Sequence, residues 1–277
     1  MAHVRSPAVA GSFYPSDPRE LRKLIDHCFV SSPLGPKGAT ERDPSLIGGM
    51  VPHAGYIYSG PCAAHLYARL DPNVDCVVLL GVNHRGRGYR AALSPYDYWE
   101  TPLGKIKVDS ELNDALKSRV AFLKDDETAH VQEHSLEVQL PFLQRVAGDF
   151  AFLPIALSDV TLAECSELGQ ALAENCTSPR QTILLASTDL SHYLSARETE
   201  RLDRLALDAV LRMQPAELLS IVEKENITMC GVLPTAVLLY ALKALGAKEA
   251  YLLKHCHSGD VTPMTDVVGY ASVAFQL

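Results

Sequence analysis

The fold is decided by residues 46–60, LIGGMVPHAGYIYSG, in which a short apolar run is followed at once by a histidine. Leu46–Val51 has the length and composition of a buried strand that stops at Pro52. The residues directly after His53 indicate a tight loop, and Pro61 is typical of the first turn of a helix. A histidine just past the carboxyl end of such a strand points into the crevice where open α/β sheets bind ligands.

An apolar run followed within a few residues by His or Asp occurs twice more along the chain, and this repetition makes the pattern informative. Residues 74–80, VDCVVLL, are followed by a glycine-rich turn that carries His84. Residues 182–187, TILLAS, are followed by TDLSHY, which contains Asp189 and His192. Since the carboxyl ends of parallel strands meet at one edge of a sheet, we expect these side chains to share one rim.

Helical patterns separate the apolar runs. They are expected at about 61–70, 109–118, 134–146 (with Pro141 as a kink or restart), 161–175, 197–213, 215–225 and 232–245, the last closed by Gly246. A further buried strand is expected at 150–157, and short strands in 91–108 around Trp99. Buried strands alternating with helices predict a mostly parallel sheet covered on both faces, hence a single αβα domain over residues 1–277.

The two ends of the chain follow other patterns. Residues 1–16 predict an extended arm held to the body by Phe13 and Tyr14, before a helix capped by Asp17. Residues 31–45 are rich in Pro, Gly and Ser and predict a loop. The last segments, EAYLLKHCH and DVVGYASVAF, predict two neighbouring strands.

Composition excludes several classes of function. The net charge of −8 and pI near 5.7 argue against nucleic acid as a partner, because phosphate binding needs a basic face. No apolar run is long enough for a membrane helix, and the start of the chain has no signal sequence, so we expect a cytoplasmic protein without a membrane partner. The seven cysteines include no C-x-x-C pair, which favours reduced thiols over disulfides or a zinc cluster.

Two imidazoles on one rim, those of His53 and His84, are the start of a divalent metal site. One candidate for the third ligand is Cys230, in NITMCGVLP, where a helix N-terminus would lower the thiol pKa and favour the thiolate. The alternative for Cys230 is a small buried hydrophobe. Asp189 is a rival ligand, or it could orient His192.

The remaining histidines are less clearly placed. His134, in EHSLEVQL, either belongs to the site or caps its helix. His65 is expected to be structural, and three others follow no strand end: His130, His255 and His257. Motifs for serine hydrolases, zincins and nucleotide binding are absent from the sequence.

The ordered motifs of the chain resemble the Memo family nearly from end to end. They are AGSFYP (10–15), VPHAGYIYSG (51–60), LLGVNH (79–84), EHSLEVQLPFL (133–143), TDLSHY (188–193), MCG (229–231) and SGDVTPMTDVVGYAS (258–272). Prokaryotic members are known as protein B of the AmmeMemoRadiSam system, which implies a functional link to AMMECR-type and radical SAM proteins. The resemblance implies a fold similar to class III extradiol (LigB-like) dioxygenases, in which two His and one carboxylate hold Fe(II).

Carried over residue by residue, the resemblance implies that His53 and His84 are metal ligands. Cys230 matches the cysteine that stands where the dioxygenases have a carboxylate. His134, Asp189 and His192 match polar residues that line the same pocket. The implied metal is Fe(II), with copper or zinc as alternatives because a thiolate is a softer ligand than a carboxylate.

Two functions from different classes follow from the resemblance. In the first, the protein is a metal-dependent redox enzyme in which His192, oriented by Asp189, moves protons, and His134 holds or protonates an oxygen species. In the second, it is a non-enzymatic adaptor that sequesters metal and binds a peptide, as animal members do. The expected ligand of the crevice is therefore a small molecule or a peptide.

Overall fold

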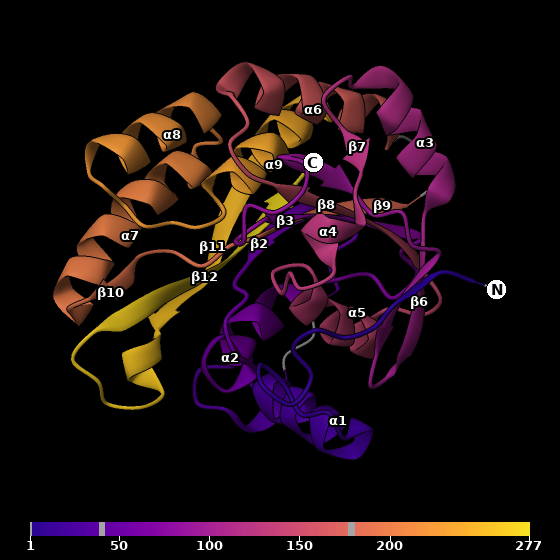
Figure 1. Cartoon of the computed structure of the whole chain (residues 1–277). Helices are drawn as coiled ribbons and strands as arrows, with labels where there is room; N and C mark the ends of the chain where they lie inside the picture. The colour runs from indigo at the N-terminus through magenta and orange to yellow at the C-terminus, as the bar shows by residue number, and fades with distance from the viewer. Residues whose placement is uncertain (1, 39–41, 177–180) are drawn as a thin grey trace.

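A central sheet organises the molecule, with helices on both of its faces (Figure 1). The computed structural model describes residues 2–38, 42–176 and 181–277. The strands are β1 (Val4–Arg5), β2 (Leu46–Val51), β3 (Cys76–Val82), β4 (Ala91–Leu93), β5 (Tyr98–Thr101), β6 (Gly104–Val108), β7 (Lys124–Asp125), β8 (Ala151–Leu157), β9 (Thr182–Ser187), β10 (His192–Leu194), β11 (Glu249–His257) and β12 (Val267–Gln276). The helices are α1 (Pro18–Asp26), α2 (Tyr56–Tyr67), α3 (Ser110–Arg119), α4 (Glu127–His130), α5 (Leu140–Val146), α6 (Leu162–Asn175), α7 (Ala196–Leu211), α8 (Pro215–Lys224) and α9 (Val232–Ala244).

The sheet has twelve strands, and its main path runs β1-β5-β6-β8-β3-β9-β2-β12-β10. The centre, from β6 to β2, is parallel, whereas β12 pairs antiparallel with β2 and carries β11 on its other side. The central strands are apolar and buried because helices cover both of their faces. The prediction of an α/β fold with a mostly parallel sheet is confirmed.

Helices divide between the two faces, as Figure 1 shows: α3, α6, α7, α8 and α9 lie on one side and α1, α2 and α5 on the other. A hydrophobic core fills each side. Most predicted boundaries hold within two residues, including the restart of the helix at Pro141, which lies in the first turn of α5. Gly246 closes α9 with a φ of 88°, as expected for a residue after a helix C-terminus.

Pro61 was expected in the first turn of a helix, and this expectation is wrong. The helix begins five residues earlier, at Tyr56, whose N–H donates to the Phe13 carbonyl at 2.9 Å, so Pro61 lies inside α2. A proline at this point leaves the Ile57 carbonyl without its helical donor. Because Ile57 is 57% exposed, water can satisfy that carbonyl instead.

The N-terminal arm is fixed differently from the prediction. Tyr14 is buried as expected, but the main anchor is Arg5, which is 1% exposed and lies in β1 beside β5. Its guanidinium forms an ion pair with buried Glu137 at 2.7 Å and lies 4.0 Å from the centre of the Trp99 ring. Tyr14 donates its hydroxyl to the same carboxylate at 2.6 Å. The predicted 31–45 loop falls partly outside the described residues.

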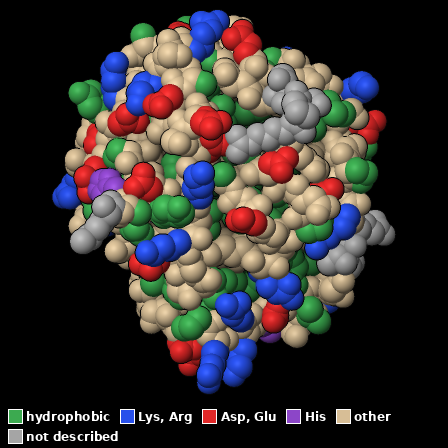
Figure 2. Space-filling model, turned by 90° about the vertical axis from the view of Figure 1, so that its right-hand side faces the viewer, with side chains coloured by type: hydrophobic (Ala, Val, Ile, Leu, Met, Phe, Trp, Pro, Cys, Tyr) green, Lys and Arg blue, Asp and Glu red, His purple; other side chains and the backbone are tan. Residues whose placement is uncertain are grey.

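The surface over α3 and β6 carries acidic and basic side chains interspersed with apolar ones, as Figure 2 shows. Basic groups do not gather into one surface on this face. No helix in the described part of the chain is both long and apolar enough to cross a membrane. All seven cysteines are thiols, as predicted.

Candidate metal site

Three neighbouring strands deliver the candidate residues to one edge of the sheet. β3 pairs in parallel with β9, and β9 with β2, so their carboxyl ends lie together. His53 and His84 each follow their strand by two residues, after β2 and β3. Asp189 follows β9 by two residues. The strand ends therefore gather the predicted residues on one rim.

The structure brings three histidines together there: His53, His84 and His134. One ring nitrogen from each lies within 4.8 Å of the others, as in a group that could hold a metal ion. The ring centres are 5.1 Å apart for His53 and His84, and 4.5 Å for His84 and His134. His134, for which the sequence left two roles open, is therefore part of this cluster.

The Ser187 hydroxyl sets the tautomer of His53. Ser187 Oγ donates its one proton to the Ser135 carbonyl at 2.6 Å and accepts from Gln139 Nε2 at 2.8 Å. The remaining contact, at 3.1 Å, is with His53 Nδ1, which must therefore carry a proton and donate it. The Nε2 atom of His53 consequently carries no proton, which is what a metal ligand needs.

The carboxylate of Glu133 sets the tautomer of His84. Its Oε1 lies 2.9 Å from His84 Nδ1 and also accepts the backbone N–H groups of His134 and Ser135, each at 2.8 Å. Burial opposes ionisation of Glu133, but the hydrogen bond and charge of His84 outweigh it, and the pKa falls to about 2. A permanent carboxylate favours a proton on His84 Nδ1, so that Nε2 is the unprotonated atom in the neutral form of that ring.

Burial keeps two of these imidazoles neutral. For His53, burial and then the charges of His84 and His134 place the pKa well below its ordinary value. Burial is also the largest cause that lowers the pKa of His134, to about 4, although Glu133 opposes it. Neutral imidazole is the form that binds metal, so neither ring has to lose a proton at neutral pH.

Cys230 contacts His53 but does not complete the same group. Its Sγ lies 3.2 Å from His53 Nε2 and accepts the N–H of Asp189 at 3.3 Å. Because that imidazole nitrogen is bare, the thiol donates to it. We expected the helix N-terminus to lower the thiol pKa, and this is wrong: burial, followed by the charge of Asp189, raises it to about 12.

Asp189 and His192 lie at the same rim with separate partners. Asp189 accepts the N–H of His53 at 2.7 Å, and burial raises its pKa to about 6 against the effect of that hydrogen bond. His192 is instead oriented by Thr228: its N–H donates to Thr228 Oγ1 at 2.7 Å, and its Nδ1 lies 2.9 Å from the Thr228 carbonyl. Thr228 therefore holds the His192 ring in this structure, and a role of Asp189 toward His192 stays a prediction.

Several residues of the site were missed from the sequence. The ring of Phe13, expected only to hold the arm, packs on His134 with 4.6 Å between ring centres. The hydrogen-bonding residues Glu133, Ser187, Gln139 and Thr228 were not singled out. A signal existed for two of them, since EHSLEVQL places Glu and Gln among apolar residues of a segment that is buried.

Replacing Ser187 by Ala tests the tautomer assignment. The change leaves the buried donors of His53 and Gln139 without an acceptor, so we expect a loss of about 1–3 kcal/mol in stability. Metal affinity should fall about 10- to 100-fold because the ring loses its orienting partner. Thermal unfolding of metal-free protein and competitive metal titration measure the two effects.

Ser191→Ala is the matched control. Its hydroxyl is buried like that of Ser187 but has no partner among the described residues. This variant should bind metal as tightly as the wild type. Equal metal affinity in the two alanine variants would contradict the role of Ser187.

Comparison with known proteins identifies relatives of nearly the whole chain. The family of Memo-like proteins matches residues 5–274. A MEMO1 family protein of Methanopyrus kandleri is 44% identical over 98% of this chain and 99% of its own, and one of Ignicoccus hospitalis is 43% identical over 99% of each. One of Thermotoga neapolitana is 40% identical over 97% of this chain and 98% of its own.

Among solved structures, an uncharacterized protein of Escherichia coli K12 shares the fold. Its TM-score is 0.53 at 13% identity, with 81% of this chain and 99% of that chain covered. The match over nearly the whole sequence confirms the resemblance noted from the motifs, and the chain belongs to the Memo family.

Proposed function

We propose that the protein binds one divalent metal ion with His53, His84 and His134, that Cys230 adds a thiolate, and that the site serves a redox reaction of a small molecule. The observation that carries the proposal is the convergence of the three imidazoles, with the Nδ1 atoms of His53 and His84 already committed to Ser187 and Glu133. One nitrogen of each ring thus lies within 4.8 Å of the other two before any metal arrives.

The donor set fits the metals that the family resemblance implies. Neutral imidazoles suit iron, copper and zinc, and a thiolate increases the preference for copper and zinc. Fe(II) is the metal we propose first, because the similarity to LigB-like dioxygenases that the family resemblance implies would favour it. When bound, such a metal would supply one-electron and oxygen chemistry.

Other side chains at the rim would handle protons and position the ligand. His192 has its Nδ1 against the Thr228 carbonyl, so its Nε2 is free to accept a proton. Phe13 contacts His134 with its ring tilted by 43°, and it also lines, with Gly55 and Tyr58, a cavity of about 590 Å³ that lies beside the three histidines and is not lined by them. A cavity of this size suits a small molecule. Cooperation with AMMECR-type and radical SAM proteins is part of the same proposal.

Proton release tests whether Cys230 becomes a ligand. With a thiol pKa of about 12, Cys230 must lose its proton to bind metal. We therefore expect wild-type protein to release about one more proton per metal than Cys230→Ala at neutral pH. Calorimetric titration in buffers of different ionisation enthalpy measures this number.

His134→Ala is the companion variant in that titration. It should release as many protons as the wild type, since the imidazole is already neutral, while its metal affinity falls. Equal proton release in wild type and Cys230→Ala would leave a site of three histidines without the thiolate. Unchanged affinity in His134→Ala would remove that residue from the ligand set.

Oxygen consumption tests the redox part of the proposal. Iron-loaded, reduced protein should consume O₂ faster than zinc-loaded protein, which has the same ligands around a metal without redox chemistry. His192→Ala should keep its iron and lose this excess. Equal rates for the iron and zinc forms would instead favour the non-enzymatic adaptor.

A further inference from the structure

β11 is an open edge of the sheet. Eight of its nine residues pair with β12, with an irregularity at Leu253, and no other described strand pairs with it. The other outermost strands, β1, β7 and β10, have only two or three residues each. β11 also exposes two large apolar side chains, Tyr251 at 44% and Leu252 at 42%. A long open strand with exposed apolar groups is a template for another strand.

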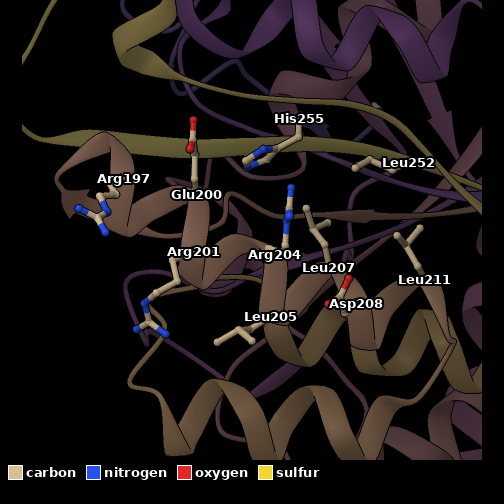
Figure 3. A pocket seen from close by; sticks show the side chains of 10 residues that line it. All are labelled: Arg197, Glu200, Arg201, Arg204, Leu205, Leu207, Asp208, Leu211, Leu252 and His255. Carbon is tan, nitrogen blue, oxygen red and sulfur yellow. The ribbon is translucent and has the colours of Figure 1, made fainter.

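A groove runs beside this edge, between β11 and α7 (Figure 3). The cavity is about 660 Å³, and leucines from both elements contribute to its wall, among them Leu207, Leu211 and Leu252. His255 of β11 faces Arg204 of α7 across it in Figure 3. Side chains that extend from a strand added at the edge would enter this groove.

The two elements that form the groove are held firmly together. His255 Nε2 lies 2.9 Å from Oδ2 of Asp203, a carboxylate of α7 that is fully buried. Asp203 Oδ1 accepts the N–H of Ser191 at 2.9 Å. The edge is therefore preformed, and little ordering would be needed for a strand to add to it.

β11 carries one acidic and one basic residue that could pair with those of a second, antiparallel copy of the strand. Glu249 stands at its beginning, and Lys254 stands near its end with two histidines following. Neither Glu249 nor Lys254 forms an ion pair with any described residue. Although Lys248 precedes Glu249, an antiparallel pair of two copies can place Glu249 of each strand beside Lys254 of the other.

We propose that two copies of this chain associate by antiparallel pairing of β11 around a two-fold axis, which continues the sheet from one copy into the next. Side chains of each added strand occupy the groove under α7 of the other copy. Since each copy offers one such edge, the assembly closes at a dimer. The self-complementary charges favour a second copy over an unrelated peptide strand. The proposal is independent of the metal site.

Sedimentation velocity of the full chain over a range of concentrations tests the dimer. The wild type should approach twice the chain mass of 30.2 kDa. Glu249→Lys and Lys254→Glu should each weaken association about 10-fold or more. The two-fold axis makes residue 249 meet residue 254 of the other copy at both ends of the strand pair, so each substitution creates two pairs of like charges. An equimolar mixture of the two variants should recover the dimer, since opposite charges then meet at both ends of the strand pair.

Glu167→Lys is the matched control, because it reverses an exposed carboxylate on α6, away from β11. It should leave association unchanged. A wild type that stays monomeric at every concentration would overturn the proposal. So would a dimer that Glu249→Lys does not weaken, or a mixture of the two variants that does not recover it.

Discussion

The site depends on the hydrogen bonds that the buried carboxylate of Glu133 accepts. This carboxylate is 1% exposed and accepts four hydrogen bonds, from the N–H and Nδ1 of His84 and from the N–H groups of His134 and Ser135. One buried charge thereby joins the loop after β3 to the segment before α5. Its backbone carbonyl also accepts a hydrogen bond from Arg5 at 2.6 Å, which ties the N-terminal arm to the same point.

A second network fixes the other side of the site. The Tyr67 hydroxyl donates to Gln139 Oε1 at 2.8 Å, and Gln139 Nε2 donates to the Ser187 hydroxyl and to the Pro52 carbonyl. The amide orientation is set, because the Pro52 carbonyl can only accept. Both networks have the same effect: on the rings of His53 and His84, which follow two different strands, they favour a proton on Nδ1 and an unprotonated Nε2.

The sequence predicted the parts of this arrangement that depend on local pattern. Apolar runs located β2 and β9, and the residues just past them included His53 and Asp189. It could not predict which partners orient the rings, since Ser187 and His53 meet only after β2 and β9 pair. The thiol pKa of Cys230 was misjudged for a similar reason: the helix N-terminus is visible in the sequence, whereas burial is not.

Histidine nitrogen shifts test the central claim most directly. In long-range ¹H–¹⁵N spectra of metal-free protein, His53 and His84 should show a protonated Nδ1 and a bare Nε2. Addition of zinc should shift the Nε2 resonances of these rings and of one nitrogen of His134, with saturation at one metal per chain. Protonated Nε2 atoms in the metal-free protein, or zinc shifts confined to other histidines, would contradict the account.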